Sequence, residues 1–125
     1  MRIEEAGYGF AVVSLEPSDG LFQIYGRIHG GVVAALADSG MGAAVYSTLL
    51  NGEAFATIDL DVRYTYPASS ETLRCRADVV RRGRRVAFAR YTVSTDQAKV
   101  IAYGSGTYAI LSENQWLRGG GGVGS

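Results

Sequence analysis

The spacing of apolar residues changes along the chain and separates one helix from several strands. Between residues 32 and 49 the apolar side chains recur at helical intervals. They are Val32, Val33, Leu36, Ala37, Met41, Ala44, Val45 and Leu49. Alanines and glycines fill most of the other positions, so this helix offers no polar face to solvent, and we expect other elements to enclose it. Asn51 and Gly52 predict its end.

Strand patterns lie on both sides of this helix. Two short strands are predicted at residues 7–16 and 21–25, separated by the turn-forming segment 16–20. In residues 57–66, Ile58, Leu60, Val62, Tyr64 and Tyr66 alternate with polar residues, which predicts one half-buried strand. Further strands are predicted around 73–79, at 86–95 and at 99–111, with residues 81–85 as a hairpin tip. Gly104 and Gly106 predict a bulge or a close backbone approach.

This order of elements predicts an α+β domain in which a curved antiparallel sheet wraps one helix. The length of 125 residues fits a single domain. We assign residues 1–111 to it and expect residues 112–125, which are rich in glycine, to form a disordered tail.

Composition narrows the classes of function. The formal net charge is zero, which gives no overall attraction to nucleic acid or to an anionic membrane. Residues 30–50 are mostly apolar, but Asp38 near their middle argues against a membrane span. The first residues carry acidic groups where a signal peptide needs an apolar run, so a cytoplasmic location is expected. With one histidine and one cysteine, neither a metal site nor an organic cofactor is predicted.

Several motifs connect this sequence with a known family. At residues 28–31 (Ile-His-Gly-Gly) and 36–39 (Leu-Ala-Asp-Ser), the chain resembles the hot-dog-fold acyl-CoA thioesterases of the phenylacetate and 4-hydroxybenzoyl-CoA type. Residues 57–68, 79–84 and 102–108 match the family's later strands in order and spacing. The resemblance implies a long central helix wrapped by a curved antiparallel sheet. It also implies hydrolysis of an aromatic or medium-chain acyl-CoA.

The resemblance assigns the two central roles to residues of the helix. Asp38 would act as nucleophile or as general base on water. Gly30 would donate its backbone N–H to the oxyanion, and the first N–H groups of a helix suit this role because they lack internal partners. Structural alternatives remain: Asp38 could bind a backbone or hydroxyl partner, and the Gly30-Gly31 pair could serve only a tight turn.

Three further residues have both a catalytic and a structural interpretation. Gln23 matches a family amide that orients the thioester or the attacking water, and it could equally be an exposed polar residue. His29 could cap or pack the helix entrance, or shape the oxyanion loop. Thr57 matches a hydroxyl that holds the hydrolytic water, although threonine is common in strands for packing reasons alone.

The spacing of Gly30 and Asp38 has a consequence for assembly. Eight residues of helix separate them by about 12 Å. One chain therefore cannot easily bring its own Asp38 to a carbonyl held at its own Gly30, whereas two antiparallel helices from two subunits can. We expect a homodimer or homotetramer with the active site at the subunit interface.

The substrate-binding residues are predicted from charge and aromaticity. Arg81, Arg82, Arg84 and Arg85 could bind the phosphates of coenzyme A, or they could be solvated charges on an exposed hairpin. The aromatic residues that could line an acyl pocket are Tyr46, Phe55, Tyr64, Tyr66 and Phe88. Two alternative functions stay open: a non-catalytic acyl-CoA-binding module, and a hot-dog enoyl hydratase or dehydratase, whose Asp-x-x-x-x-His and His-Phe-Pro-Gly patterns the sequence lacks.

Overall fold

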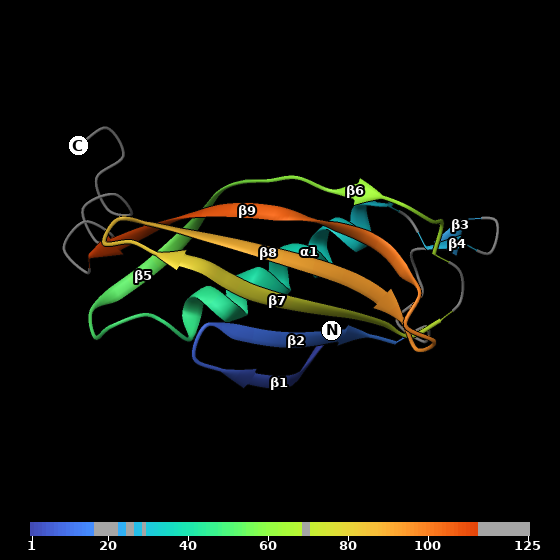
Figure 1. Cartoon of the computed structure of the whole chain (residues 1–125), viewed down its shortest axis with the longest axis horizontal. Coiled ribbons are helices and arrows are strands. Elements are labelled where there is room, and N and C mark those ends of the chain that lie inside the picture. The colour runs from blue at the N-terminus through green and yellow to red at the C-terminus, as the bar shows by residue number, and fades with distance from the viewer. Residues whose placement is uncertain (17–22, 25–26, 29, 69–70, 113–125) are drawn as a thin grey trace.

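The computed structural model describes residues 1–16, 23–24, 27–28, 30–68 and 71–112, with the backbone alone for 23–24 and 27–28. One helix and nine strands follow one another in these residues (Figure 1). They are β1 (Arg2–Gly7), β2 (Phe10–Leu15), β3 (Gln23–Ile24), β4 (Arg27–Ile28), α1 (Gly30–Tyr46), β5 (Glu53–Leu60), β6 (Arg63–Tyr64), β7 (Leu73–Arg82), β8 (Val86–Thr95) and β9 (Val100–Ser112).

A single curved sheet packs against one helix. Its strand order is β1-β2-β7-β8-β9-β5, every neighbouring pair is antiparallel, and β6 also pairs with β9. Figure 1 shows α1 running along one face of this sheet behind β7 and β8. The small β3–β4 sheet lies just before the helix. This is the predicted α+β architecture.

The helix approaches the sheet closely because its contact face is made of small residues. A Cβ atom at Gly40 would lie 2.5 Å from Cys75 Sγ on β7, so no side chain fits there. The inner residues of β7 are equally small, apart from Leu73 at its start. Leu36 and Met41 fill the remaining space as fully buried side chains. The glycine-rich helix thus packs close to the sheet, and this close packing determines the positions of its polar side chains.

One side of α1 stays uncovered, contrary to the expected enclosure. Gly31, Ala35, Ser39 and Tyr46 are exposed and lie on a single face of the helix. The opposite face is buried against the sheet. Among the described residues, no helix is both long and apolar enough to cross a membrane.

Two predictions of strand boundaries were wrong. Residues 7–16 were expected to form one strand, but a turn at Tyr8 and Gly9 separates β2 from β1. Gly9 adopts φ 80°, a left-handed conformation that suits glycine. The strand β1 was missed because its side chains are mostly exposed and show no buried stripe.

The segment 57–66 was also predicted as one strand, and it is divided in two. The register with β9 shifts between Thr57 and Asp59, and β5 ends at Leu60. Asp61 then binds Ser105 with its side chain, accepting from the backbone N–H at 3.2 Å and from the hydroxyl at 2.9 Å. The Asp61 backbone N–H still donates to Ser105 O at 2.9 Å, but the regular ladder ends at Leu60 and resumes only at Arg63, so the predicted alternation of burial is lost.

Other predictions of local structure are confirmed. The arginine-rich segment 81–85 joins β7 to β8, and Gly83 N–H donates to Val86 O at 2.9 Å. A Cβ at Gly104 would lie 2.4 Å from Asp61 O, and one at Gly106 would lie 2.9 Å from Met41 Cε. Both glycines of β9 therefore mark close approaches.

Candidate active site

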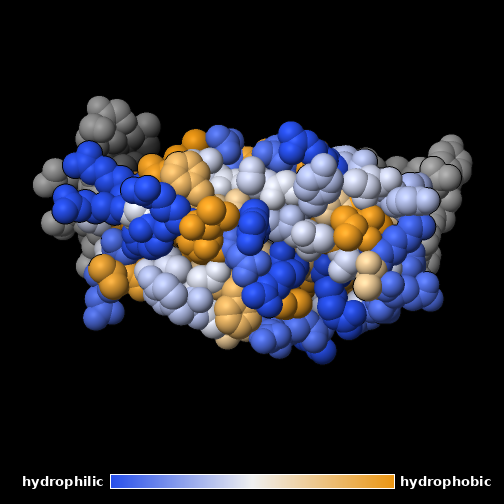
Figure 2. Space-filling view, viewed as in Figure 1, coloured by the Kyte–Doolittle hydropathy of each residue, from blue (hydrophilic) through white to orange (hydrophobic). Residues whose placement is uncertain are grey.

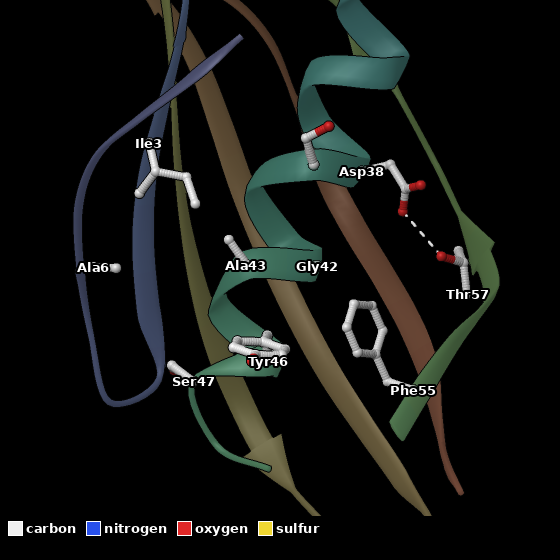
Figure 3. Close-up of a pocket in the computed structure, with 10 residues that line it drawn as sticks. Ile3, Ala6, Asp38, Gly42, Ala43, Tyr46, Ser47, Phe55 and Thr57 are labelled. Atoms are coloured by element: carbon white, nitrogen blue, oxygen red, sulfur yellow. Dashed lines mark hydrogen bonds between the residues drawn. The ribbon is translucent and has the colours of Figure 1, made fainter. Parts of the chain in front are cut away.

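An open cavity of about 610 Å³ lies on the uncovered side of α1 (Figure 3). Residues from β1, from α1 with the turn after it, and from β5 surround it. They are Ile3, Ala6, Asp38, Ser39, Gly42, Ala43, Tyr46, Ser47, Phe55 and Thr57. Most of these side chains are apolar or small, and Asp38 is the only acid among them. A single carboxylate therefore stands at the rim of a mostly apolar space.

Asp38 is held by two hydroxyl groups. Thr57 Oγ1 donates to Asp38 Oδ1 at 3.1 Å, and Tyr108 OH donates to the same oxygen at 2.9 Å. Thr57 on β5 and Tyr108 on β9 are direct partners in the strand register, so their side chains lie on the same face of the sheet. Figure 3 shows Asp38 reaching from α1 toward Thr57. The structure thus brings together the two residues that the sequence predicted separately.

Tyr108 was not predicted as a site residue. Its side chain is 0% exposed, and its ring packs edge-on against Phe55 with centroids 5.9 Å apart. Burial, followed by the hydrogen bond to Asp38, raises the pKa of Tyr108 above its ordinary value. The phenol therefore stays protonated and acts as a donor. The signal was available, because a buried tyrosine hydroxyl in a strand usually needs an acceptor.

The N-terminal end of α1 lies directly against Tyr64. Gly30 is the first helical residue, and Tyr64 OH from β6 donates to its carbonyl oxygen at 2.7 Å. A Cβ at Gly30 would lie 3.2 Å from that hydroxyl oxygen. Tyr64 therefore covers the helix entrance and does not line the cavity beside Asp38.

The remaining predicted site residues are placed in part. Gln23 pairs with Ile28 across the β3–β4 ladder, which brings its backbone close to the segment that enters α1. Its side chain and His29 lie outside the described part of the structure. Gly30 and Asp38 sit at the start and middle of one continuous helix, so the separation of about 12 Å holds.

The four arginines of the hairpin divide into two kinds. Arg82 is only 16% exposed and forms an ion pair with Glu53 at the start of β5. Its Nε also donates to Thr48 Oγ1 at 3.1 Å, just beyond the end of α1. Arg81, Arg84 and Arg85 have exposed side chains. Figure 2 shows hydrophilic residues gathered at this end of the molecule.

Two aromatic residues of the predicted acyl pocket, Tyr46 and Phe55, line the cavity. Tyr66 instead lies under the Lys99 ammonium group, 3.5 Å from its ring centroid. Phe88 pairs with Arg81 in the β7–β8 ladder and is exposed. Fewer aromatic residues thus line the cavity than the sequence predicted for the acyl pocket.

Neither metal nor thiol chemistry is indicated in the described residues. No three histidine, cysteine, aspartate or glutamate side chains are grouped there to hold a metal ion. Cys75 is buried under α1, and burial raises the pKa of its thiol to about 12. This thiol is therefore not an available nucleophile.

Comparisons with known proteins identify the family of this chain. A model of the thioesterase superfamily matches residues 25–102. The Halobacterium salinarum protein VNG_1336C is 37% identical over 97 residues, which are 71% of this chain and 64% of that protein. The medium/long-chain acyl-CoA thioesterase YigI of Escherichia coli is 31% identical over 96 residues, 66% of this chain and 62% of that protein. The chain thus spans less than two thirds of the length of both relatives.

A solved structure supports the fold. A hypothetical thioesterase protein of Streptococcus pneumoniae, crystallised with coenzyme A, superposes with a TM-score of 0.80 at 20% identity. The match covers 89% of this chain and 85% of that one. The single helix against a curled antiparallel sheet is therefore the hot-dog fold, and the chain belongs to the thioesterase superfamily.

Proposed function

We propose that this protein hydrolyses the thioester of an acyl-CoA, with the Asp38 carboxylate as the catalytic group. One observation carries the proposal: a carboxylate with two hydroxyl donors on one oxygen stands at the rim of an apolar cavity. A member of the thioesterase superfamily with this arrangement has what the reaction needs, namely a reactive acid and space for an apolar acyl group. The YigI relative, named a medium/long-chain acyl-CoA thioesterase, points to the same class of substrate.

The reaction follows from the roles of Asp38 and Gly30. Asp38 either attacks the thioester carbonyl carbon itself or removes a proton from a water that does so. The carbonyl oxygen becomes an oxyanion, which the backbone N–H at the Gly30 end of α1 stabilises. With Asp38 as general base, the C–S bond then breaks, the sulfur of coenzyme A takes up the proton that Asp38 had removed from water, and the free acid is released. With Asp38 as nucleophile, the C–S bond breaks to leave an acyl-Asp38 anhydride, and the sulfur takes up a proton from solvent. Water then hydrolyses the anhydride, which releases the free acid and regenerates Asp38.

The active unit in this proposal is a homodimer, alone or within a homotetramer. The uncovered face of α1 and the edge strand β5 expose large apolar side chains, with Tyr46 at 69% and Ile58 at 54% exposure. Two antiparallel copies of α1 across this face would place the Gly30 of one chain beside the Asp38 of the other. The 12 Å gap within one chain would then be bridged by symmetry.

The cavity favours an apolar acyl group. Its volume of about 610 Å³ falls within the range of roughly 300–1,000 Å³ that is usual for ligand pockets. From Asp38 it extends along Gly42 and Ala43 toward Phe55 and Tyr46. Aliphatic chains of medium length and aryl groups both suit such walls. Phenylacetyl- or 4-hydroxybenzoyl-like substrates belong to this second group.

The exposed arginines offer a place for the phosphates of coenzyme A. Arg82 ties the β7–β8 hairpin to Thr48, so the hairpin lies at the C-terminal end of α1. In the antiparallel dimer, the partner's oxyanion site would lie beside Asp38, about two helical turns before this end. Arg81, Arg84 and Arg85 could then meet the phosphates as the pantetheine arm leaves that site. Arg82 itself is left out, because Glu53 already pairs with its charge.

The first test is release of free thiol from a panel of aryl and aliphatic acyl-CoAs. Asp38→Asn is expected to lower kcat at least about 100-fold with an unchanged unfolding transition. Asp96→Asn, in an exposed turn, is the matched control and keeps wild-type turnover. Wild-type rates for Asp38→Asn would refute the assignment. Tight acyl-CoA binding without turnover would instead support a non-catalytic module, and a change in enoyl-CoA absorbance would support a hydratase.

The second test addresses the shared site. In the dimer, Asp38→Asn chains and Gly30→Val chains are each inactive, but a mixed dimer contains one intact site. Random mixing should therefore restore about a quarter of wild-type activity. If both groups acted within one chain, mixing would restore none.

A further inference from the structure

We propose that Tyr108 is a positioning residue that fixes the orientation of the Asp38 carboxylate for catalysis. The inference rests on the proposed function, since it assigns Tyr108 a role only if Asp38 is the reacting group. Tyr108 does not face the cavity, and it would act through Asp38 alone.

The two carboxylate oxygens of Asp38 differ in their hydrogen bonds. Oδ1 accepts from both Thr57 and Tyr108, at 3.1 and 2.9 Å. Among the residues that the structure describes, none donates to Oδ2. The carboxylate is therefore anchored through one oxygen while the other remains available for the carbonyl carbon or for water.

Tyr108 is the more rigid of the two anchors. Its ring is fully buried, and Phe55 packs against it edge-on with an interplanar angle of 64°. On another side, a Cβ at Gly106 would come within 3.1 Å of Tyr108 Cε1, so the ring occupies the space that this glycine leaves. Thr57 is exposed, and its hydroxyl can turn toward water or substrate. The fixed phenol thus sets the direction of the carboxylate.

The protonation state of Tyr108 suits a permanent donor. Burial and the neighbouring carboxylate raise the pKa of Tyr108, so the phenol keeps its proton across the working pH range. The other titratable group that acts on it is Cys75 on β7, whose thiol is neutral because burial raises its pKa to about 12. Tyr108 therefore remains a donor to the Asp38 carboxylate.

A purely structural role would need only some acceptor for the buried hydroxyl, and Tyr91 provides the comparison. It is 3% exposed, lies on the neighbouring strand β8, and donates to the backbone carbonyl of Asp61 at 2.8 Å. Tyr108→Phe and Tyr91→Phe each remove one buried phenolic hydroxyl. Only the first removes a bond to Asp38, so the pair separates positioning from stability.

The experiment measures kcat and KM for acyl-CoA hydrolysis. Tyr108→Phe is expected to lower kcat by about 10- to 100-fold with KM within about twofold. The loss should appear in kcat and not in KM, because the variant removes an anchor of the carboxylate and no contact with the substrate. Tyr91→Phe should leave both unchanged. A Tyr108→Phe kcat equal to that of the wild type would overturn the proposal.

Two further variants keep the outcomes separate. If Tyr108→Phe does not fold, Gly106→Ala tests the same point. Its new Cβ would lie 2.9 Å from Met41 Cε and 3.1 Å from Tyr108 Cε1, so both side chains must shift while the hydroxyl remains. A lowered kcat supports positioning, and an unchanged kcat refutes it. Wild-type turnover in Asp38→Asn would instead refute the proposed function itself. Loss of activity in Asp38→Asn with no effect at Tyr108 refutes the positioning role alone.

Discussion

The close contact between α1 and β7 leads to a quantitative prediction for Gly40→Ala. The added Cβ would lie 2.5 Å from Cys75 Sγ and 3.3 Å from Cys75 Cβ. Cys75 is fully buried, so the sulfur has no free space to enter. Overpacking of a core costs about 1–3 kcal/mol. Replacing a helical glycine by alanine returns about 1 kcal/mol. We expect a net loss of up to about 2 kcal/mol of unfolding free energy.

Gly42 supplies the matched control in the same helix. There the nearest atoms to an added Cβ are those of the Phe55 ring at 3.4 Å, an ordinary contact distance. Gly42→Ala should therefore gain up to about 1 kcal/mol from helix propensity alone. The same change, two residues apart, is thus expected to have opposite signs.

A double-mutant cycle identifies the sulfur as the cause. In a Cys75→Ala background the nearest obstacle to the Gly40→Ala methyl is a Cβ at 3.3 Å, so the added cost should largely vanish. We expect a coupling energy of about 1–3 kcal/mol. Urea unfolding at one fixed protein concentration is the assay, since association would otherwise shift the midpoints. Additive effects, or equal effects of Gly40→Ala and Gly42→Ala, would refute this account of helix packing.

Three other predictions concern the site and its surroundings. Tyr64→Phe loses the hydrogen bond to Gly30 O, so we expect kcat to fall several-fold and the free energy of unfolding to fall by about 1 kcal/mol. A kcat equal to that of the wild type would contradict a role for Tyr64 at the helix entrance. Arg84→Glu with Arg85→Glu should raise KM for acyl-CoA, most strongly at low salt, and leave turnover of a short acyl-pantetheine unchanged. Cys75 should resist thiol reagents in the native state. Burial raises the pKa of the Cys75 thiol from 9.0 to about 12, so between these pH values the folded protein holds more protons than the unfolded chain. The free energy of unfolding should therefore fall as the pH rises from 9 toward 12. A free energy of unfolding that does not change over this range would contradict the burial of Cys75.

The sequence was informative where a pattern is repeated over many residues. The helix and the long strands β7, β8 and β9 were predicted, because periodic burial marks them directly. The arginine hairpin was predicted from its glycine. The resemblance singled out Asp38 and Thr57, and the structure joins them by a hydrogen bond. What local patterns could not give was pairing between distant strands. Tyr108 reaches Asp38 only because β9 lies beside β5, an alignment that depends on register across the sheet.

Two misjudged features share a physical cause. The prediction of one strand over 57–66 assumed regular ladder pairing, whereas the Asp61 side chain binds Ser105 from 44 residues away. Grouping Arg82 with its neighbours assumed that all four charges face solvent, whereas its guanidinium binds Glu53 and Thr48. In both cases a charged side chain binds a residue far away in the sequence and not water. Composition alone does not reveal such partners.

The geometry of α1 ties catalysis to assembly. In the proposed reaction, the same helix must offer the Gly30 backbone N–H at its start and a carboxylate that reaches two hydroxyls on neighbouring strands. Because β5 and β9 cross α1 near its middle turn, Asp38 lies about two helical turns from the Gly30 N–H. No rotation of side chains closes a gap of about 12 Å. A second copy laid antiparallel on the uncovered face satisfies both demands, which is why the mixed-dimer experiment bears on the chemistry as well as on the assembly.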